Sequence, residues 1–142
     1  PGRRASRLGG RRGNVRLLLD THVFVWAVAD PERLSKAAAD AIRLPGNDLF
    51  LSSAVAWELA TKYRIGTFPE AKAIIDDFES LAVDLVARHL PVSHDHALRA
   101  GLMTVEHRDP FDRVLAAQAE IEGLALITRD PVFGAFGLDL VW

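Results

Sequence analysis

Four carboxylate side chains lie in short motifs that suit chemistry on a charged substrate. They are Asp20 in LLLD, Glu58 in SAVAWELA, Asp112 in HRDPFDR and Asp130 in LITRD. If such groups meet, mutual repulsion raises their pKa values or opens the site unless a cation lies between them. The chain has no cysteine, and carboxylates with water favour Mg²⁺ or Mn²⁺. Because such ions activate water and stabilise charge on a phosphodiester, this pattern predicts nuclease chemistry.

Each acid also has a purely structural explanation. In HRDPFDR, Asp109 before a proline is typical of a helix N-cap, and Asp112 then lies in the first helical turn. Glu58 lies too far inside its segment to cap a helix, but it can pair with Lys62 four residues later. Asp20 can cap the helix that follows it. For any one residue, these alternatives stay open.

The elements that position the acids alternate between strands and helices. Short apolar runs predict strands over 15–19, 48–52, 90–93, 124–128 and 137–142. Between them, helical periodicity, serine caps and glycine stops predict helices over 21–29, 35–44, 53–65, 69–85, 94–102 and 109–122. This alternation predicts an α/β fold, a three-layer α/β/α sandwich with a mainly parallel central sheet.

This fold class gives the acids a common location. Asp20 directly follows the first strand, and Asp130 follows the strand over 124–128 by two residues. Glu58 and Asp112 lie near helix starts, which point to the same edge. Because sites in parallel α/β sheets form beyond the carboxyl ends of the strands, we expect all four carboxylates to converge there.

Charge is distributed unevenly along the chain. Six arginines lie at or before position 16, and no acid precedes Asp20; from residue 17 onward, 11 basic and 19 acidic residues give a net charge of −8. An acidic body does not attract nucleic acid by bulk charge, although local arginines or bound cations can. We expect residues 1–14 to be a basic arm that is disordered or left from expression, with a nucleic-acid-binding tail as the alternative, and residues 15–142 to form one domain.

Apolar runs in the sequence are short, and none reaches the 18 residues expected of a transmembrane helix. The absence of cysteine is typical of a reducing compartment. We therefore expect a cytoplasmic protein that does not associate with a membrane.

Four stretches, LLLDTHVFVW, SAVAWELATKYRIG, HRDPFDRVLAAQA and LALITRDPVFGAFG, resemble the PIN-domain ribonucleases in the family's order. They look most like the VapC toxins of bacterial toxin–antitoxin pairs, and the resemblance covers residues 15–142. It implies that one or two Mg²⁺ or Mn²⁺ ions are held by the four acids, Asp20, Glu58, Asp112 and Asp130. Asp109 is outside the core family positions, and we expect it to support the ligands or cap its helix.

The resemblance further implies an activity and partners. It implies a metal-dependent endoribonuclease in which activated water attacks an RNA phosphodiester, leaving a 5′-phosphate and a 3′-hydroxyl. Such a toxin inhibits translation and is blocked by a cognate VapB-type antitoxin whose C-terminal segment wraps it. A homodimer is the usual unit, which becomes a heterotetramer or larger with antitoxin.

Residues beside the acids each have more than one possible role. The hydroxyls of Thr21 and Thr128 can orient carboxylates or water, or cap turns. Three arginines can contact RNA phosphates, neutralise the site or form structural ion pairs: Arg108, Arg113 and Arg129. His107 is not expected to be a metal ligand.

Two alternatives belong to other functional classes. A phosphatase with an aspartate nucleophile shares LLLD, but it needs a second aspartate where this chain has His22, and a lysine that is missing near Asp130. A non-catalytic PIN-fold binding module would keep the fold and sequester a partner, but the presence of all four acids argues against it.

Overall fold

The computed structural model describes residues 14–142 and contains a five-stranded parallel sheet with the order β3-β2-β1-β4-β5. The strands are β1 (Arg16–Leu19), β2 (Asp48–Ser52), β3 (Ala87–Leu90), β4 (Ala125–Ile127) and β5 (Leu140–Val141). The proposed N-terminal arm lies outside the described residues, except for Asn14, whose backbone N–H donates to the Gly46 carbonyl at 3.1 Å.

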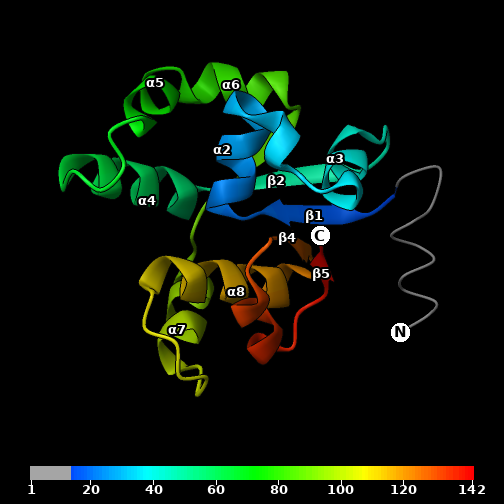
Figure 1. Cartoon of the computed structure of the whole chain (residues 1–142). Coiled ribbons are helices and arrows are strands. Elements are labelled where there is room, and N and C mark those ends of the chain that lie inside the picture. Colours follow the sequence, from blue (N-terminus) through cyan, green and yellow to red (C-terminus); the bar gives the residue numbers. More distant parts are fainter. Residues whose placement is uncertain (1–13) are drawn as a thin grey trace.

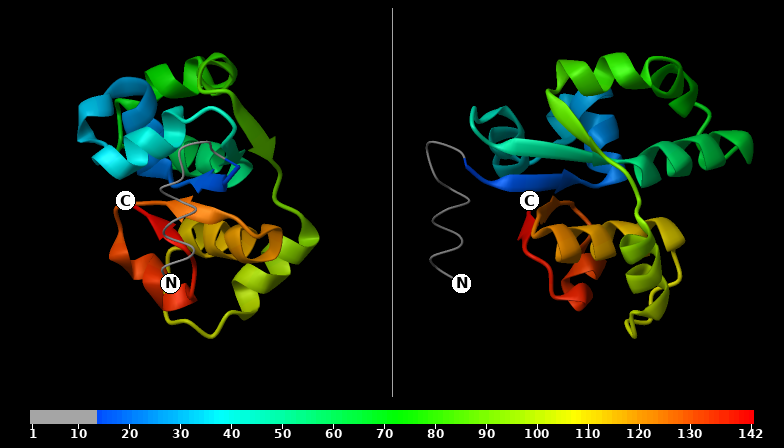
Figure 2. Two further views of the ribbon diagram at one scale, coloured as in Figure 1. Left: turned by 90° about the vertical axis from the view of Figure 1, so that its right-hand side faces the viewer. Right: turned by 180° about the vertical axis from the view of Figure 1, so that it is seen from behind.

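Helices cover both faces of the sheet, so the predicted three-layer sandwich is confirmed (Figure 1; Figure 2). Above it in Figure 1 lie α2 (Thr21–Ala29), α3 (Lys36–Arg43), α5 (Ala71–Asp76) and α6 (Phe78–Asp84). Below it lie α7 (His94–Leu102), α8 (Pro110–Glu122) and the 3₁₀ segment η2 (Pro131–Phe136). A second 3₁₀ segment, η1 (Pro31–Arg33), follows α2. In the described part of the chain, none of these helices is long and apolar enough to cross a membrane.

The central strand explains the apolar pattern of the sequence. Leu17, Leu18 and Leu19 of β1 are fully buried, because β1 pairs with β2 on one side and β4 on the other and is covered on both faces. Such a strand is a continuous apolar run rather than an alternating one. Asp20 directly follows this run and therefore lies at the carboxyl edge of the sheet.

The helix that follows β2 reaches past this edge. It is α4 (Ser53–Arg64), which starts at the end of β2 and extends leftward in Figure 1, between α5 above and α8 below. The Ser52 side chain accepts from the Ala54 N–H and caps it. At its other end, Gly66 has φ +84°, a conformation that glycine adopts without strain. The predicted start and stop of this helix are confirmed.

Two predicted elements differ from the structure. The single helix expected over 69–85 is two helices, α5 and α6, because Asp77 between them leaves helical geometry at φ −113°, ψ 24°. The strand expected over 90–93 lies earlier, at Ala87–Leu90, where β3 pairs with β2. Only the second error lies at the outer edge of the sheet, since α5 contributes Ala73 and Ile74 to the cavity that Asp20 also lines.

Candidate active site

Three of the four predicted acids lie near one another at the carboxyl edge; Asp20 and Glu58 are buried, and Asp112 is half-buried. Asp20 follows β1, Glu58 lies in the second turn of α4, and Asp112 is the third residue of α8. Asp20 is 6% exposed and Glu58 is 3% exposed. The charges of Asp20 and Glu58 both help to raise the pKa of Asp112, which shows that the three carboxyls are close enough to repel one another.

Asp20 is held by hydrogen bonds on both carboxyl oxygens. Its Oδ1 accepts from the Thr21 N–H at 2.8 Å, and its Oδ2 accepts from the Thr128 hydroxyl at 2.7 Å. Burial raises the pKa of Asp20 despite these bonds, and the charge of Glu58 adds to the increase. The carboxylate is thus fixed in orientation but poorly compensated in charge.

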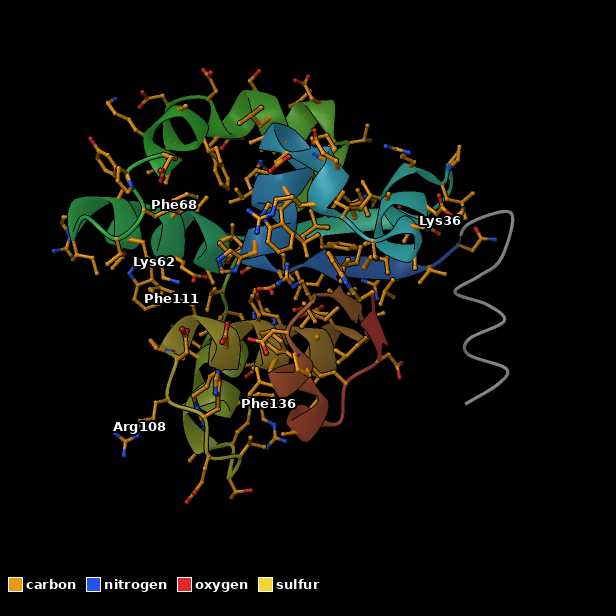
Figure 3. The ribbon with its side chains drawn as sticks, in the orientation of Figure 1. Lys36, Lys62, Phe68, Arg108, Phe111 and Phe136 are labelled. Carbon is orange, nitrogen blue, oxygen red and sulfur yellow. The ribbon has the colours of Figure 1, made fainter. Side chains whose placement is uncertain are left out.

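Glu58 lies between a hydroxyl and an ammonium group. Thr21 Oγ1 donates to Glu58 Oε1 at 2.5 Å, and Lys62 Nζ donates to Glu58 Oε2. The i,i+4 pair that the sequence offered as an alternative therefore forms, although Glu58 is buried rather than on the surface. Lys62 projects from α4 towards Phe111 of α8 (Figure 3). The positive charge of Lys62 is thereby placed at the acidic group.

The carboxyl of Asp112 is strongly perturbed by its surroundings. Burial raises its pKa to about 6; a hydrogen bond with His107 opposes the increase, and the charge of Asp109 adds to it. His107 Nε2 lies 2.8 Å from Asp112 Oδ2. Asp109 accepts from the N–H groups of Phe111 and Asp112 at 2.9 and 3.0 Å, so its predicted helix-capping role is confirmed.

Asp130 stands apart from this group. It is exposed, and its Oδ1 accepts from the Val132 N–H at 3.0 Å, capping η2. Its own backbone N–H donates to Thr128 Oγ1 at 3.0 Å, and Thr128 in turn donates to Asp20. Asp130 is therefore connected to the buried acids through one threonine hydroxyl, and it lines the same cavity as Asp20.

Among the three predicted arginines, Arg113 has a structural role. Its guanidinium donates to the carbonyls of Ala100, Met103, Val105 and His107 at 2.6–3.0 Å. These bonds shape the loop that carries His107 to Asp112. By contrast, Arg108 points away from the protein into solvent (Figure 3).

Replacing Arg113 with glutamine should destabilise the protein by about 2–3 kcal/mol, because several carbonyls lose a charged donor together. Urea unfolding of the wild type and the variant measures this change. Arg108→Gln is the matched control and should change stability by less than about 0.5 kcal/mol, as an exposed substitution. An equal, small effect of both variants would mean that the loop does not depend on Arg113.

Sequence reasoning did not assign the contact between His107 and Asp112. The two residues are five apart and His107 precedes α8, so no helical spacing brings them together. Their contact depends on the loop that Arg113 shapes, a conformation that no local motif encodes. The presence of both residues in HRDPFDR was the only available signal.

A cavity of about 1040 Å³ is lined by Asp20 and Asp130, whereas Glu58 and Asp112 do not line it. Its wall combines acidic, basic and apolar side chains: Asp20, His22, Val25, Trp26, Ala29, Asp30, Arg33, Lys62, Thr67, Phe68, Glu70, Ala73, Ile74, Arg129, Asp130 and Pro131. The cavity is large enough for part of a polymeric substrate, since ligand pockets are typically about 300–1,000 Å³.

The donor set suits a hard divalent cation. Within residues 14–142, no three histidine, aspartate or glutamate side chains are already arranged as a metal site. Asp20 and Asp112 nevertheless have raised pKa values, mainly because burial removes water from their carboxyls and to a smaller extent because of the charge of Glu58. A cation that prefers carboxylate oxygen, such as Mg²⁺ or Mn²⁺, would relieve this repulsion. Asp20, Glu58 and Asp112 therefore fit such an ion chemically.

The PIN-domain family model matches residues 17–137, which include all four acids. The chain belongs to the PIN-domain family. The PIN domain is 33% identical over 116 residues to Ribonuclease VapC22 of Mycobacterium tuberculosis (strain ATCC 25618 / H37Rv), covering 80% of this chain and 86% of that protein. The predicted family is confirmed, and an aspartate-nucleophile phosphatase of another family loses its basis.

Solved structures share the PIN fold at low sequence identity. The VapBC2 structure from Rickettsia felis, bound to a DNA fragment from its promoter, matches with a TM-score of 0.64 and 18% identity over 89% of this chain and 97% of that one. FitAcB from Neisseria gonorrhoeae matches with a TM-score of 0.61 and 21% identity over 87% of this chain and 95% of that one. These likenesses support the fold.

Proposed function

We propose that this PIN domain is a metal-dependent endoribonuclease and the toxin of a VapBC-type toxin–antitoxin pair. The observation that carries the proposal is the convergence of Asp20, Glu58 and Asp112 from three separate segments at one edge of the sheet, where Asp20 and Glu58 are buried and their charges add to the raised pKa of Asp112. A structural ion pair accounts for Glu58, which binds Lys62, but one lysine supplies a single positive charge for three carboxyls, and like charges close together destabilise a fold. The 33% identity to a protein named as a ribonuclease supports the same activity.

Each residue has a defined task in this reaction. Asp20, Glu58 and Asp112 would hold Mg²⁺ or Mn²⁺, with Asp130 at the cavity wall as a further candidate ligand. When bound, the ion would supply positive charge to the phosphodiester and acidify water for the hydrolysis. Thr21 contacts both Asp20 and Glu58, and so fixes the spacing of these two acids. In the same way, the contact with His107 orients the Asp112 carboxyl.

A VapB-type antitoxin is the proposed partner. Two of the matching structures are described as VapBC2 and FitAcB, and the relative by sequence is named VapC22. By this likeness we propose a homodimer that forms a heterotetramer or larger assembly with antitoxin. We further propose that the toxin acts in the cytoplasm, where cutting RNA inhibits translation.

Cleavage of total cellular RNA by antitoxin-free protein tests the activity. We expect discrete cuts with Mn²⁺ or Mg²⁺, none with EDTA, and a reaction that is about 10²–10³-fold slower for Asp20→Asn, since removing a key electrostatic group at an active site costs about that much. Circular dichroism must show that the variant folds. Asp40→Asn, on the exposed face of α3, is the control and should cut normally.

Two results would argue against the proposal. Cutting that persists in EDTA and in Asp20→Asn would place the reaction elsewhere or in a contaminant. Folded protein that cuts no RNA with either metal, yet binds its antitoxin, would support the non-catalytic binding module instead.

A further inference from the structure

Two arginines from separate segments meet on one tryptophan in the cavity wall. Arg33 Cζ lies 4.7 Å from the Trp26 ring centroid, and Arg129 Cζ lies 5.5 Å from it. Trp26 is a rigid base for them, since it is buried in α2 and packs against His22 and Trp142 at 5.8 and 5.9 Å between ring centroids. Because a guanidinium stacked on an aromatic ring keeps its N–H groups at its edge, both can still bind a ligand.

Neither guanidinium is bound to the protein in the way that three other arginines are. Arg113 binds carbonyls, Arg99 pairs with Glu120, and Arg88 pairs with Asp48. Within residues 14–142, Arg33 and Arg129 have neither an ion pair nor a hydrogen bond from their side chains, although the charge of Arg33 acts on the carboxyl of Asp30 in the same cavity wall. Since Arg side chains at functional surfaces typically bind carboxylates or phosphates, two unpaired ones facing one cavity indicate an anion site.

The cavity places this pair beside the acids. Asp130 directly follows Arg129, and Asp20 lines the same cavity, while Lys62 lies in another part of its wall on α4. An extended ligand that crosses the cavity would thus meet positive charge at the arginine pair and again at Lys62. The carboxylates of Asp20 and Asp130 lie in the same wall. Apolar side chains such as Phe68 and Ile74 complete the wall.

We propose that Arg33 and Arg129, supported by Trp26, bind a backbone phosphate of single-stranded RNA next to the phosphodiester that is cut. This inference rests on the proposed nuclease function and identifies one side of its substrate path. An RNA strand fits because its phosphates repeat, so one reaches the arginines while another reaches the acids. The rest of the described body is acidic, and these arginines provide the local attraction that its net charge does not.

The test measures RNA binding without cleavage. Fluorescence anisotropy with a 5′-labelled oligouridylate in EDTA compares wild type, Arg33→Gln, Arg129→Gln and the double variant. Each single change should weaken binding about 5–10-fold, and should lower the slope of log affinity against log salt by about 0.7, the value for one phosphate contact on a single strand. Arg43→Gln, an exposed arginine of α3 outside the cavity, removes the same charge and should leave both quantities unchanged.

Steady-state cleavage with Mn²⁺ separates a binding role from a metal role. The two variants should raise KM while kcat and the Mn²⁺ concentration for half-maximal activity stay within about twofold of wild type. Arg33→Lys and Arg129→Lys should recover part of the affinity, because they keep the charge but lose the planar stack.

Failure of this inference is distinguishable from failure of the nuclease function. If wild type cuts RNA but the glutamine variants bind and cut like Arg43→Gln, the phosphate site is wrong and the nuclease function stands. If wild type neither binds nor cuts RNA, the nuclease function itself fails. If the variants lose affinity for the antitoxin while keeping that for RNA, the arginines belong to a protein interface and the inference is overturned.

Discussion

Replacing Asp112 with asparagine should reduce RNA cleavage about 10²–10³-fold and yet stabilise the metal-free protein at pH 7. The loss of activity is expected because Asp112 is one of the three converging acids. The gain in stability is expected because burial raises the pKa of Asp112 to about 6, so its ionised form is unfavourable in the folded state. Asparagine keeps the shape and removes the charge. We expect a gain of about 1–2 kcal/mol, after allowing for the partial exposure of this group.

The gain should depend on pH in a defined direction. Between pH 3.8 and about 6, the folded protein holds the Asp112 proton more tightly than the unfolded chain does, so wild-type stability falls as pH rises through this window. The difference between variant and wild type should therefore be small near pH 4, grow up to about pH 6 and then stay constant. Urea unfolding at several pH values measures it.

Asp95→Asn is the matched control for this prediction. Asp95 lies in the first turn of α7, where the helix dipole stabilises a negative charge. Replacing it with asparagine should therefore not increase the stability of the protein at pH 7. Adding Mn²⁺ should raise the melting temperature of wild type more than that of Asp112→Asn. A variant that is no more stable than wild type at pH 7, or that gains equally at pH 4, would show that the Asp112 charge is compensated in the folded state.

The sequence predicted the framework of the site because local rules set it. Asp20 ends an apolar run that must be a buried strand, and Asp109 before Pro110 starts a helix whatever surrounds it. A parallel sheet then sends Asp20 and the starts of α4 and α8 to one edge. The predicted fold class, the capping by Asp109 and the convergence of three of the four expected acids follow from these constraints.

The rest depends on contacts between distant segments. Whether Asp130 joins the buried acids depends on how the β4–η2 turn sits, and the structure leaves it exposed and linked only through Thr128. The stacking of Arg33 and Arg129 on Trp26 joins three segments, and neither spacing nor periodicity encodes it. The break at Asp77 also has no local signal in the sequence, because no proline or glycine lies between α5 and α6.

Replacing Lys62 with methionine should destabilise the metal-free protein by about 3 kcal/mol, because it leaves Glu58 buried without its cation. Glu58 is 4% exposed at its side chain, and its other hydrogen bond comes from the neutral hydroxyl of Thr21. Burial lowers the pKa of Lys62, but bonding to Glu58 and the charges of Asp109 and Asp112 raise it above its usual value overall. Lys62 is therefore a fixed positive charge for several acids.

The chain supplies a matched control, since Lys36 and Asp40 form the same i,i+4 pair on an exposed surface. Lys36→Met should cost less than about 0.5 kcal/mol. A double-mutant cycle with Glu58→Gln isolates the coupling, because the double variant has no unpaired charge and should recover most of the lost stability. Equal losses for Lys62→Met and Lys36→Met would mean that solvent, not Lys62, compensates Glu58.

The same variant distinguishes a structural ion pair from a metal site. If Lys62 and a divalent cation neutralise the same carboxylates, removing Lys62 leaves those carboxylates more negative for the cation. Mn²⁺ should then bind Lys62→Met more tightly than wild type and raise its melting temperature by a larger amount. Isothermal titration calorimetry measures the affinity directly. Unchanged or weaker Mn²⁺ binding in Lys62→Met would show that Lys62 and the metal do not compete, and that the lysine instead holds Glu58 in position to bind the ion.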